Sequence, residues 1–309
     1  MRHLIAATAI GLAAALPAFA DYPSKPVSFI IPWPPGDLED ILTRLIADAF
    51  QAEHGVPAAV INRPGGGGGP FPGAIDVATA EADGHTIGSF VIDVPVIGHE
   101  IGIPELTPEK FDPVGIFLTY PFVIATGKDA PYSTMEELRD HARNNPVALG
   151  HFGIVATPTQ VTMALSAQMG FEWGSDAAFD AVDCNTLASG DADVINTTIQ
   201  LILPCLDQVK MLASITEERI VLAPDTPTVA EIAPDLALST WNGLFVPKGT
   251  PEEVKATIAA TAERVVLGEQ AQRIAAETGA LVYWKDAAAS AERIAKDQEI
   301  VARIQQMIE

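Results

Sequence analysis

Residues 32–40 read Pro32-Trp33-Pro34-Pro35-Gly36-Asp37-Leu38-Glu39-Asp40, and they connect the apolar run Val27 to Ile31 to an amphipathic segment. A second corner of the same kind, residues 62–69, reads Asn62-Arg63-Pro64-Gly65-Gly66-Gly67-Gly68-Gly69 and follows the apolar run Ala58 to Ile61. An open α/β sheet presents backbone N–H groups to ligands at such strand-to-helix corners. The two corners therefore predict a ligand-binding cleft rather than a reaction centre.

The first twenty residues have the pattern of a secretory signal peptide. Arg2 and His3 form a short basic start, Leu4 to Leu16 are almost wholly apolar, and Ala18-Phe19-Ala20 fits a small-x-small cleavage site. A membrane anchor is the alternative, but the apolar stretch is shorter than the ~20 residues that a spanning helix needs. We therefore predict that residues 1–20 are removed, that the mature chain starts at Asp21, and that the protein is periplasmic.

Composition indicates a folded, strongly acidic protein. Without the 20 residues of the signal, 289 of the 309 residues remain, which is enough for two domains. The hydrophobic content of 48% and charged content of 19% are those of a folded chain. Once Arg2 is removed, 17 Lys and Arg face 40 Asp and Glu, a net charge of −23. Such a charge argues against nucleic acid and anionic membrane surfaces as partners.

Strand-like and helix-like segments alternate along the chain, which predicts an α/β fold with parallel sheets and crossover helices. No Ser/Pro-rich linker interrupts the sequence, so we expect two lobes joined by strands. We expect a helix after each corner, the second at residues 74–82, and another from Ser133 to about Asn144. Residues 251–306 are expected to be mostly helical, with an interruption near 279–283. Strands are expected at residues 86–92, 121–125, 147–152, 192–195 and 241–247.

Common short enzyme motifs, among them Gly-x-Ser-x-Gly, His-Glu-x-x-His and the Walker loop, are absent from the sequence. We therefore expect no enzyme, no cofactor and no metal site. The histidines are scattered, but His151 ends an expected strand, where an α/β sheet places ligands. A packed or solvated histidine is the alternative.

Several residues of the two corners have both a binding and a structural interpretation. The glycine run is able to hold an anion with its N–H groups, or to be a loop that binds nothing. Asp37 is placed as the N-cap of a helix and Asp40 as its third residue, so Asp40 has a possible structural role. Trp33 and Trp241 stand beside the expected cleft, although core packing is the commoner fate of a tryptophan.

Cys184 and Cys205 are the only cysteines. An even number of cysteines in an oxidising compartment predicts one disulfide. Two separate buried thiols are the alternative, since the sequence does not give the distance between them.

Six motifs together resemble the Bug-type substrate-binding receptors of tripartite tricarboxylate transporters. They are the segments 22–27, 32–40, 62–65, 82–86, 225–231 and 241–247, and they span essentially the whole mature chain. The resemblance implies a two-lobed periplasmic binding fold of type II, a Venus flytrap, with lobe 1 at residues 21–122 and 240–309 and lobe 2 at 123–239. It also implies a protein that binds a small molecule, usually a carboxylate, and delivers it to membrane permease subunits. We expect this protein to be a monomer.

The resemblance also nominates ligand-binding residues by position. Combined with the residues singled out above, the set is Trp33, Pro35, Gly36, Asp37, Asp40, Gly66, Gly67, Gly68, His151, Phe152, Thr157, Thr159, Phe179, Thr197 and Trp241. The pocket departs from the family pattern: Asp37-Leu38-Glu39 replaces a glycine-rich run, and the second-lobe corner keeps Thr157 and Thr159 but few small residues.

These departures lead to a specific expectation and two alternatives. The expected ligand is a mono- or dicarboxylate with an apolar or aromatic portion, because Asp37 and Glu39 disfavour multiply charged anions while Trp33, Phe152 and Phe179 suit an apolar body. The first alternative is an amine or another cation recognised by the added acids. The second is a sensor module that presents its closed form to a membrane signalling partner.

Overall fold

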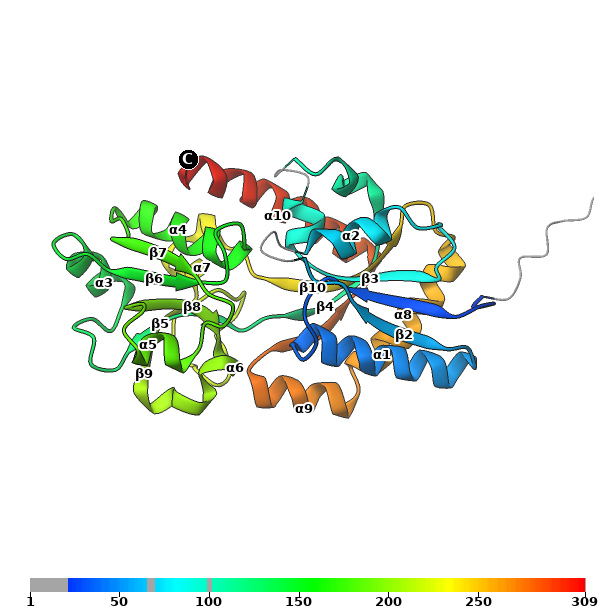
Figure 1. Ribbon diagram of the computed structural model, residues 1–309, viewed down its shortest axis with the longest axis horizontal. Helices are drawn as coiled ribbons and strands as arrows, with labels where there is room; N and C mark the ends of the chain where they lie inside the picture. Colours follow the sequence, from blue (N-terminus) through cyan, green and yellow to red (C-terminus); the bar gives the residue numbers. More distant parts are fainter. Residues whose placement is uncertain (1–21, 66–69, 99–101, 309) are drawn as a thin grey trace, which may run out of the picture.

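The computed structural model describes residues 22–65, 70–98 and 102–308, and it has two lobes placed side by side, each built on its own β-sheet (Figure 1). The two-lobed α/β fold is the one expected from the sequence. The expected signal peptide and the glycines Gly66, Gly67 and Gly68 lie outside the described residues.

The first sheet has six strands. Its parallel part places β1 between β2 and β3, and β10 then runs antiparallel between β3 and β4, with β11 antiparallel at the edge. The strands in spatial order are β11 (Leu281–Lys285), β4 (Phe111–Thr119), β10 (Trp241–Pro247), β3 (Thr86–Val91), β1 (Val27–Ile31) and β2 (Ala58–Asn62).

The second sheet has five strands, and its central strands β8 and β5 are antiparallel to each other. The strands in spatial order are β7 (Ser175–Ala178), β6 (Ala148–His151), β8 (Val194–Thr198), β5 (Phe122–Gly127) and β9 (Val209–Ser214). The chain leaves the first sheet between β4 and β5 and returns to it between β9 and β10. The assignment of residues 21–122 and 240–309 to one lobe and 123–239 to the other stays a prediction; β5 of the second sheet begins at Phe122.

Helices cover both sheets, and the C-terminal helix α10 extends from the first lobe across to the second, where it packs against α4 (Figure 1). The helices are α1 (Leu38–His54), α2 (Phe71–Ala78), α3 (Met135–Ala142), α4 (Thr157–Met169), α5 (Cys184–Ala188), α6 (Ile199–Ile202), α7 (Val229–Ile232), α8 (Glu252–Val266), α9 (Glu269–Thr278) and α10 (Ala287–Ile308). Short helical turns η1 (Asp93–Ile97), η2 (Pro104–Leu106), η3 (Pro108–Lys110), η4 (Leu203–Gln208) and η5 (Pro234–Leu236) complete the fold.

Some element boundaries differ from the sequence expectation. The helix expected at residues 74–82 is α2 (Phe71–Ala78), which begins earlier because a proline is tolerated in the first turn of a helix. The interruption expected near 279–283 is the edge strand β11. The strands β4, β7 and β9 were not expected; β4 contains Pro113 and Gly115, residues that weaken a strand signal.

The hydrophobic core is continuous between the lobes. One cluster of buried side chains includes Phe29 and Phe90 of the first sheet together with Leu149 and Val194 of the second. A smaller cluster, with Val123 and Ile195, lies in the second lobe. Burial of this apolar surface at roughly 25 cal/mol per Å² is the main force that holds the elements together.

The second lobe also contains a disulfide. The sulfur atoms of Cys184 and Cys205 are joined, with their Cα atoms 6.0 Å apart. The bond ties α5 to the turn η4 beside the smaller cluster. It is the pairing that the two cysteines of the sequence predicted.

Candidate functional site

The corner after β1 is held together by the carboxylate of Asp40. One oxygen accepts hydrogen bonds from the Gly36 N–H (3.0 Å) and Arg44 Nε (2.9 Å), and the other from Arg44 Nη2 (2.8 Å) and Asn62 Nδ2 (2.9 Å). Burial opposes ionisation, but these hydrogen bonds outweigh it and lower the pKa of Asp40. Gly36 has a φ of +106°, a conformation that favours glycine. Asp40 therefore serves the structural role that we considered for it.

The remaining residues of this corner include an unused donor. The Trp33 carbonyl accepts a hydrogen bond from Asn62 Nδ2 (3.0 Å), whereas the ring Nε1 of Trp33 is buried without a partner. Pro35 and Asp37 are exposed. Asp37 occupies the N-cap position of α1 as expected, but its side chain makes no capping hydrogen bond. Partial desolvation and the Asp40 charge raise the pKa of Asp37.

Glu39 lies behind this corner and contacts the strand crossover between the lobes. Its side chain is buried, and the hydroxyl of Tyr120 lies 2.5 Å from its Oε2. Burial, aided by the Asp37 charge, raises the pKa of Glu39 to about 8. Glu39 is thus mostly protonated at neutral pH, and the wall of the first lobe is less negative than its sequence indicates. Tyr120 was not expected at the site, because no local pattern marks it.

His151 organises the corner that follows β6 in the second lobe. Its Nδ1 accepts from the Gly153 N–H (3.0 Å), which leaves Nε2 to donate to Asp176 (3.0 Å), and its carbonyl accepts from the Phe179 N–H (2.9 Å). The ring is buried and both nitrogens are occupied. These contacts fit the packed-histidine alternative: His151 positions the corner, in which Gly153 has a φ of +144°.

Aromatic rings in contact connect the crossover to this corner. The Tyr120 and Phe122 rings are 6.2 Å apart, and Phe152 packs edge-to-face on Phe122 at 6.1 Å and 88°. The half-buried Phe179 approaches Gly150 beneath the same corner. Two exposed apolar residues, Ile154 and Val155, follow Phe152. The predicted apolar residues of the second lobe therefore lie together.

The first turn of α4 binds a carboxylate group. The backbone N–H and the hydroxyl of Thr157 both donate to Oδ1 of Asp93, at 2.9 and 2.8 Å. Asp93 follows β3 of the first lobe, so the contact joins the two lobes. Two residues further along the same turn, the hydroxyl of Thr159 is buried without a partner. Asp93 was missed from the sequence, because it lies 64 residues from Thr157 and carries no motif.

Two nominated residues use their polar atoms within the fold. The Thr197 hydroxyl donates to the Val182 carbonyl, and the Trp241 ring Nε1 donates to Asp297 Oδ2 at 2.7 Å. Trp241 is fully buried, which fits the core-packing alternative. Thr198, next to Thr197 in the sequence, has a buried hydroxyl without a partner. Thr198 pairs in the sheet with Phe122, beside the crossover.

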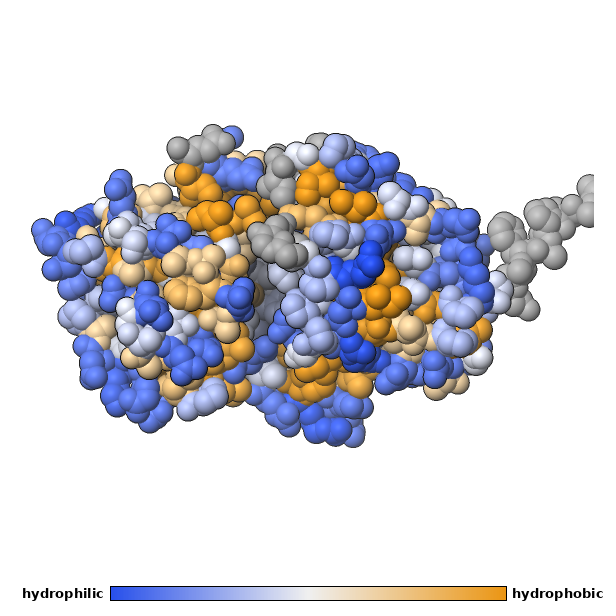
Figure 2. Space-filling view, in the orientation of Figure 1, coloured by the Kyte–Doolittle hydropathy of each residue, from blue (hydrophilic) through white to orange (hydrophobic). Residues whose placement is uncertain are grey.

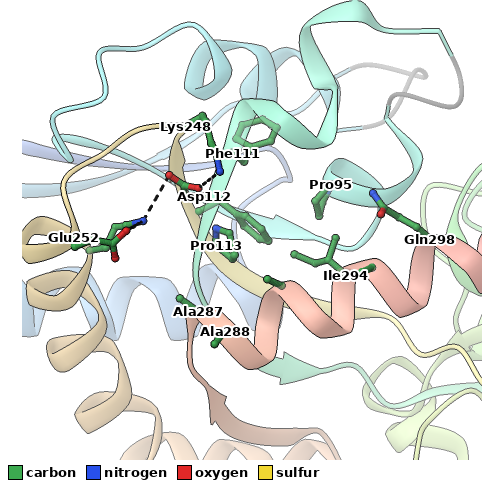
Figure 3. Close-up of a pocket in the computed structure, with 14 residues that line it drawn as sticks. Pro95, Phe111, Asp112, Pro113, Lys248, Glu252, Ala287, Ala288, Ile294 and Gln298 are labelled. Carbon is green, nitrogen blue, oxygen red and sulfur yellow. Dashed lines mark hydrogen bonds and ion pairs between the residues drawn. The ribbon is translucent and has the colours of Figure 1, made fainter.

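The corners after β1, β3 and β6 thus face the boundary between the lobes, where the surface is hollowed (Figure 2). Two cavities of the described residues lie away from this boundary. One of about 430 Å³ in the first lobe is bordered by Phe111, Ile294 and alanines of α10, with Lys248 bound to Asp112 at its rim (Figure 3). Another of about 250 Å³ adjoins Tyr132. Neither is lined by a residue nominated from the sequence.

Comparison with known proteins fits this arrangement of two lobes and facing corners. Residues 42–309 match the model of the tripartite tricarboxylate transporter family receptor, TctC. The chain belongs to this receptor family. It is 30% identical over 250 residues to the UPF0065 protein in the tcbD-tcbE intergenic region of Pseudomonas sp. strain P51, covering 75% of this chain and 71% of that protein.

Solved structures of similar fold come from Rhodopseudomonas palustris. MatC with bound malate superposes with a TM-score of 0.75 at 24% identity, covering 93% of this receptor and 100% of that chain. Rpa4515 with adipate gives a TM-score of 0.77 at 22% identity, covering 93% and 98%. These structures share the fold, and the match to the receptor family confirms the resemblance to Bug-type receptors.

Membership of this family settles the class of the protein. Its members are solute receptors rather than enzymes, in agreement with the expectation from the sequence. Among the described residues, no helix has the length and apolar character needed to cross a membrane. No group of His, Cys, Asp or Glu side chains in those residues is arranged to hold a metal ion.

Proposed function

We propose that the chain is a periplasmic receptor that binds a small mono- or dicarboxylate with an apolar or aromatic portion. The observation that carries this proposal is the pair of donors at the start of α4. The N–H and hydroxyl of Thr157 hold a carboxylate oxygen, supplied here by Asp93. A helix N-terminus favours an anion through its free N–H groups and its dipole.

The surroundings of Thr157 support a ligand with an apolar body. Phe122 and Phe152 form an aromatic surface near the crossover, and the exposed Ile154 and Val155 lie between Phe152 and Thr157. The structures with bound malate and adipate indicate that this fold accommodates small dicarboxylates. A ligand that places one carboxylate at the start of α4 and has an apolar remainder fits the same surfaces.

The acidic wall of the first lobe is compatible with such a ligand. Glu39 has a pKa of about 8 and is mostly neutral at pH 7, while Asp40 is neutralised by Arg44. Of the acidic residues described at this wall, Asp37 at the exposed corner and Asp93 then remain as charged carboxylates. Trp33 adds a buried N–H donor without a partner.

One observation favours an amine as a second candidate. The charges of Glu39, Asp37 and Asp93 all lie near enough to Tyr120 to add to the burial that raises its pKa. A cationic ligand between these groups would favour the ionised form of Glu39 and would then gain from each of the three carboxylates.

Matched ligands separate the two candidates. Isothermal titration of the mature protein from Asp21 with adipate and with 1,6-diaminohexane compares two ligands of the same length and opposite charge. We expect heat of binding with adipate, and an affinity in Asp37→Asn that is unchanged or higher. Binding of the diamine alone, weakened in Asp37→Asn, would replace the carboxylate proposal by the amine.

Delivery to the membrane permease subunits of a tripartite tricarboxylate transporter is part of the proposal. Deletion of the receptor gene should abolish uptake of the labelled solute. Retained uptake together with a lost transcriptional response would identify the sensor alternative. N-terminal sequencing of the exported protein should begin at Asp21.

A further inference from the structure

Asp93 and Thr157 make a contact that resembles a bound solute rather than an ordinary contact between lobes. Asp93 is the first residue of η1, 6% exposed, and it extends from the end of β3 to the other lobe. Both donors of Thr157 converge on the same oxygen, Oδ1. The N-terminus of a helix binds an anion in the same way, through hydrogen bonds to a carboxylate or phosphate oxygen.

Within the described part of the chain, the Asp93 carboxylate has no cationic partner. Among residues 22–65, 70–98 and 102–308, no Lys, Arg or His nitrogen lies within 4.0 Å of it. Burial accordingly raises the pKa of Asp93, and the hydrogen bonds from Thr157 offset only part of the effect. A buried carboxylate without a counter-ion is costly. The stabilisation of the Asp93 carboxylate in this position therefore depends on the N-terminus of α4.

We propose that Asp93 occupies the carboxylate position of α4 while no solute is bound, and that a solute carboxylate binds by displacing it. This inference rests on the proposed function and adds the residue that sets the affinity. Thr157 has one N–H and one O–H, so two carboxylates are unable to share these donors fully. Two ionised carboxylates in contact also repel each other. Asp93 is thus a built-in competitor of the solute.

The arrangement of α10 gives this competition a structural setting. The helix packs against both η1 and α4, and it therefore contacts the two elements that carry Asp93 and Thr157. With α10 in place, the lobes are kept near each other whichever carboxylate occupies the site. Exchange of one carboxylate for another then requires movement of Asp93 more than separation of the lobes.

Calorimetric titration with adipate and malate tests the inference on the mature protein. The variants are Asp93→Asn, which keeps the shape of the side chain, and Asp93→Ala, which empties the position. Asp48→Asn, at an exposed position of α1, is the control for loss of one negative charge. We expect Kd to fall about tenfold in both Asp93 variants, a change that one close like charge is able to produce, and to stay unchanged in the control.

A local measurement complements the affinities. In protein labelled with ¹⁵N-threonine, the Thr157 amide proton reports its hydrogen bond to a carboxylate. Its resonance should shift upfield in Asp93→Ala without solute and return when adipate is added. In the wild type, adipate should move it little, because one carboxylate replaces another.

The outcomes separate this inference from the proposed function. Tighter binding in both variants together with the restored amide resonance supports it. Binding by the variants but not by the wild type would show that the solute does not displace Asp93, and it overturns both the inference and the proposed function. Equal affinity in the wild type and both variants overturns the inference and leaves the function intact. Weaker binding in the variants than in the wild type also overturns the inference. Absence of carboxylate binding in the wild type and in all variants overturns both the inference and the proposed function.

Discussion

The hydroxyl oxygen of Tyr120 lies 2.5 Å from Oε2 of Glu39, and this contact fixes the start of α1 to the crossover between the lobes. Glu39 and Tyr120 are 2% and 7% exposed. The pair lies 81 residues apart in sequence and between the two sheets. Its ionisation state therefore affects both the stability of the fold and the charge of the site.

Glu39 should make the folded protein less stable as the pH rises. Burial raises its pKa from 4.5 to about 8, so the folded state binds this proton more tightly than the unfolded state does. The stabilisation is complete below about pH 4.5 and is lost as the pH rises through about 8. Glu39→Gln removes this ionisation, and its free energy of unfolding in urea should fall less over this interval than that of the wild type.

The control for this measurement is Glu277→Gln, at an exposed position on α9. It should reproduce the pH dependence of the wild type. Equal slopes for Glu39→Gln and the wild type would show that Glu39 ionises as it does in the unfolded chain.

Asp40 should act on stability more than on binding. Asp40→Asn replaces an acceptor of four hydrogen bonds and leaves Arg44 without its ionic partner. Because Arg44 is partly exposed, we expect a loss of about 2 kcal/mol in the free energy of unfolding, below the range for fully buried pairs. Urea unfolding measures it, with Asp48→Asn as the control. Unchanged stability with a large loss of affinity would instead make Asp40 a ligand contact.

Thr159 should act on binding more than on stability. Its buried hydroxyl has no partner, so Thr159→Val, which keeps the shape, should leave stability unchanged or raise it by up to about 1 kcal/mol. If a solute uses this donor, titration should show an affinity several-fold lower. The control on the same helix is Thr162→Val, whose hydroxyl donates to Pro158 and accepts from Asn196, and which should lose stability. Full affinity in Thr159→Val would remove Thr159 from the site.

The disulfide should stabilise the second lobe without contributing to the site. It closes a loop across a separation of 21 residues, and the double variant Cys184→Ser with Cys205→Ser should lose about 3 kcal/mol in the free energy of unfolding. Unfolding of the wild type in reductant is the matched comparison. A change in solute affinity as large as the change in stability would mean that the bond also positions the cleft.

The sequence indicated many local elements because local patterns encode them. Alternating apolar and amphipathic runs marked β1, β3, β10 and α1, and the corner at Gly36 was placed between β1 and α1. Elements without such a pattern were not predicted. The interruption near residues 279–283 was not identified as a strand, although it is β11, which forms at the edge of the first sheet beside β4. A strand of this kind is defined by its neighbour rather than by its own residues.

The site was only partly predictable. Thr157 and Thr159 were nominated by resemblance and lie at the start of α4, whereas Trp241 and Asp40 use their polar atoms within the fold. The same residue types serve binding and structure, so the sequence left both interpretations open. The partners of each side chain decide between them.

By itself, the sequence determined the α/β class, the family, the candidate corners and the single pair of cysteines, all of which depend on neighbouring residues or on composition. Only the tertiary structure brought Glu39 to Tyr120 and Asp93 to Thr157, across 81 and 64 residues. Such contacts depend on how two lobes pack and on which buried polar groups then need partners. The buried donors of Thr157 need a partner, and the carboxylate of Asp93 in the same chain supplies it at the N-terminus of α4.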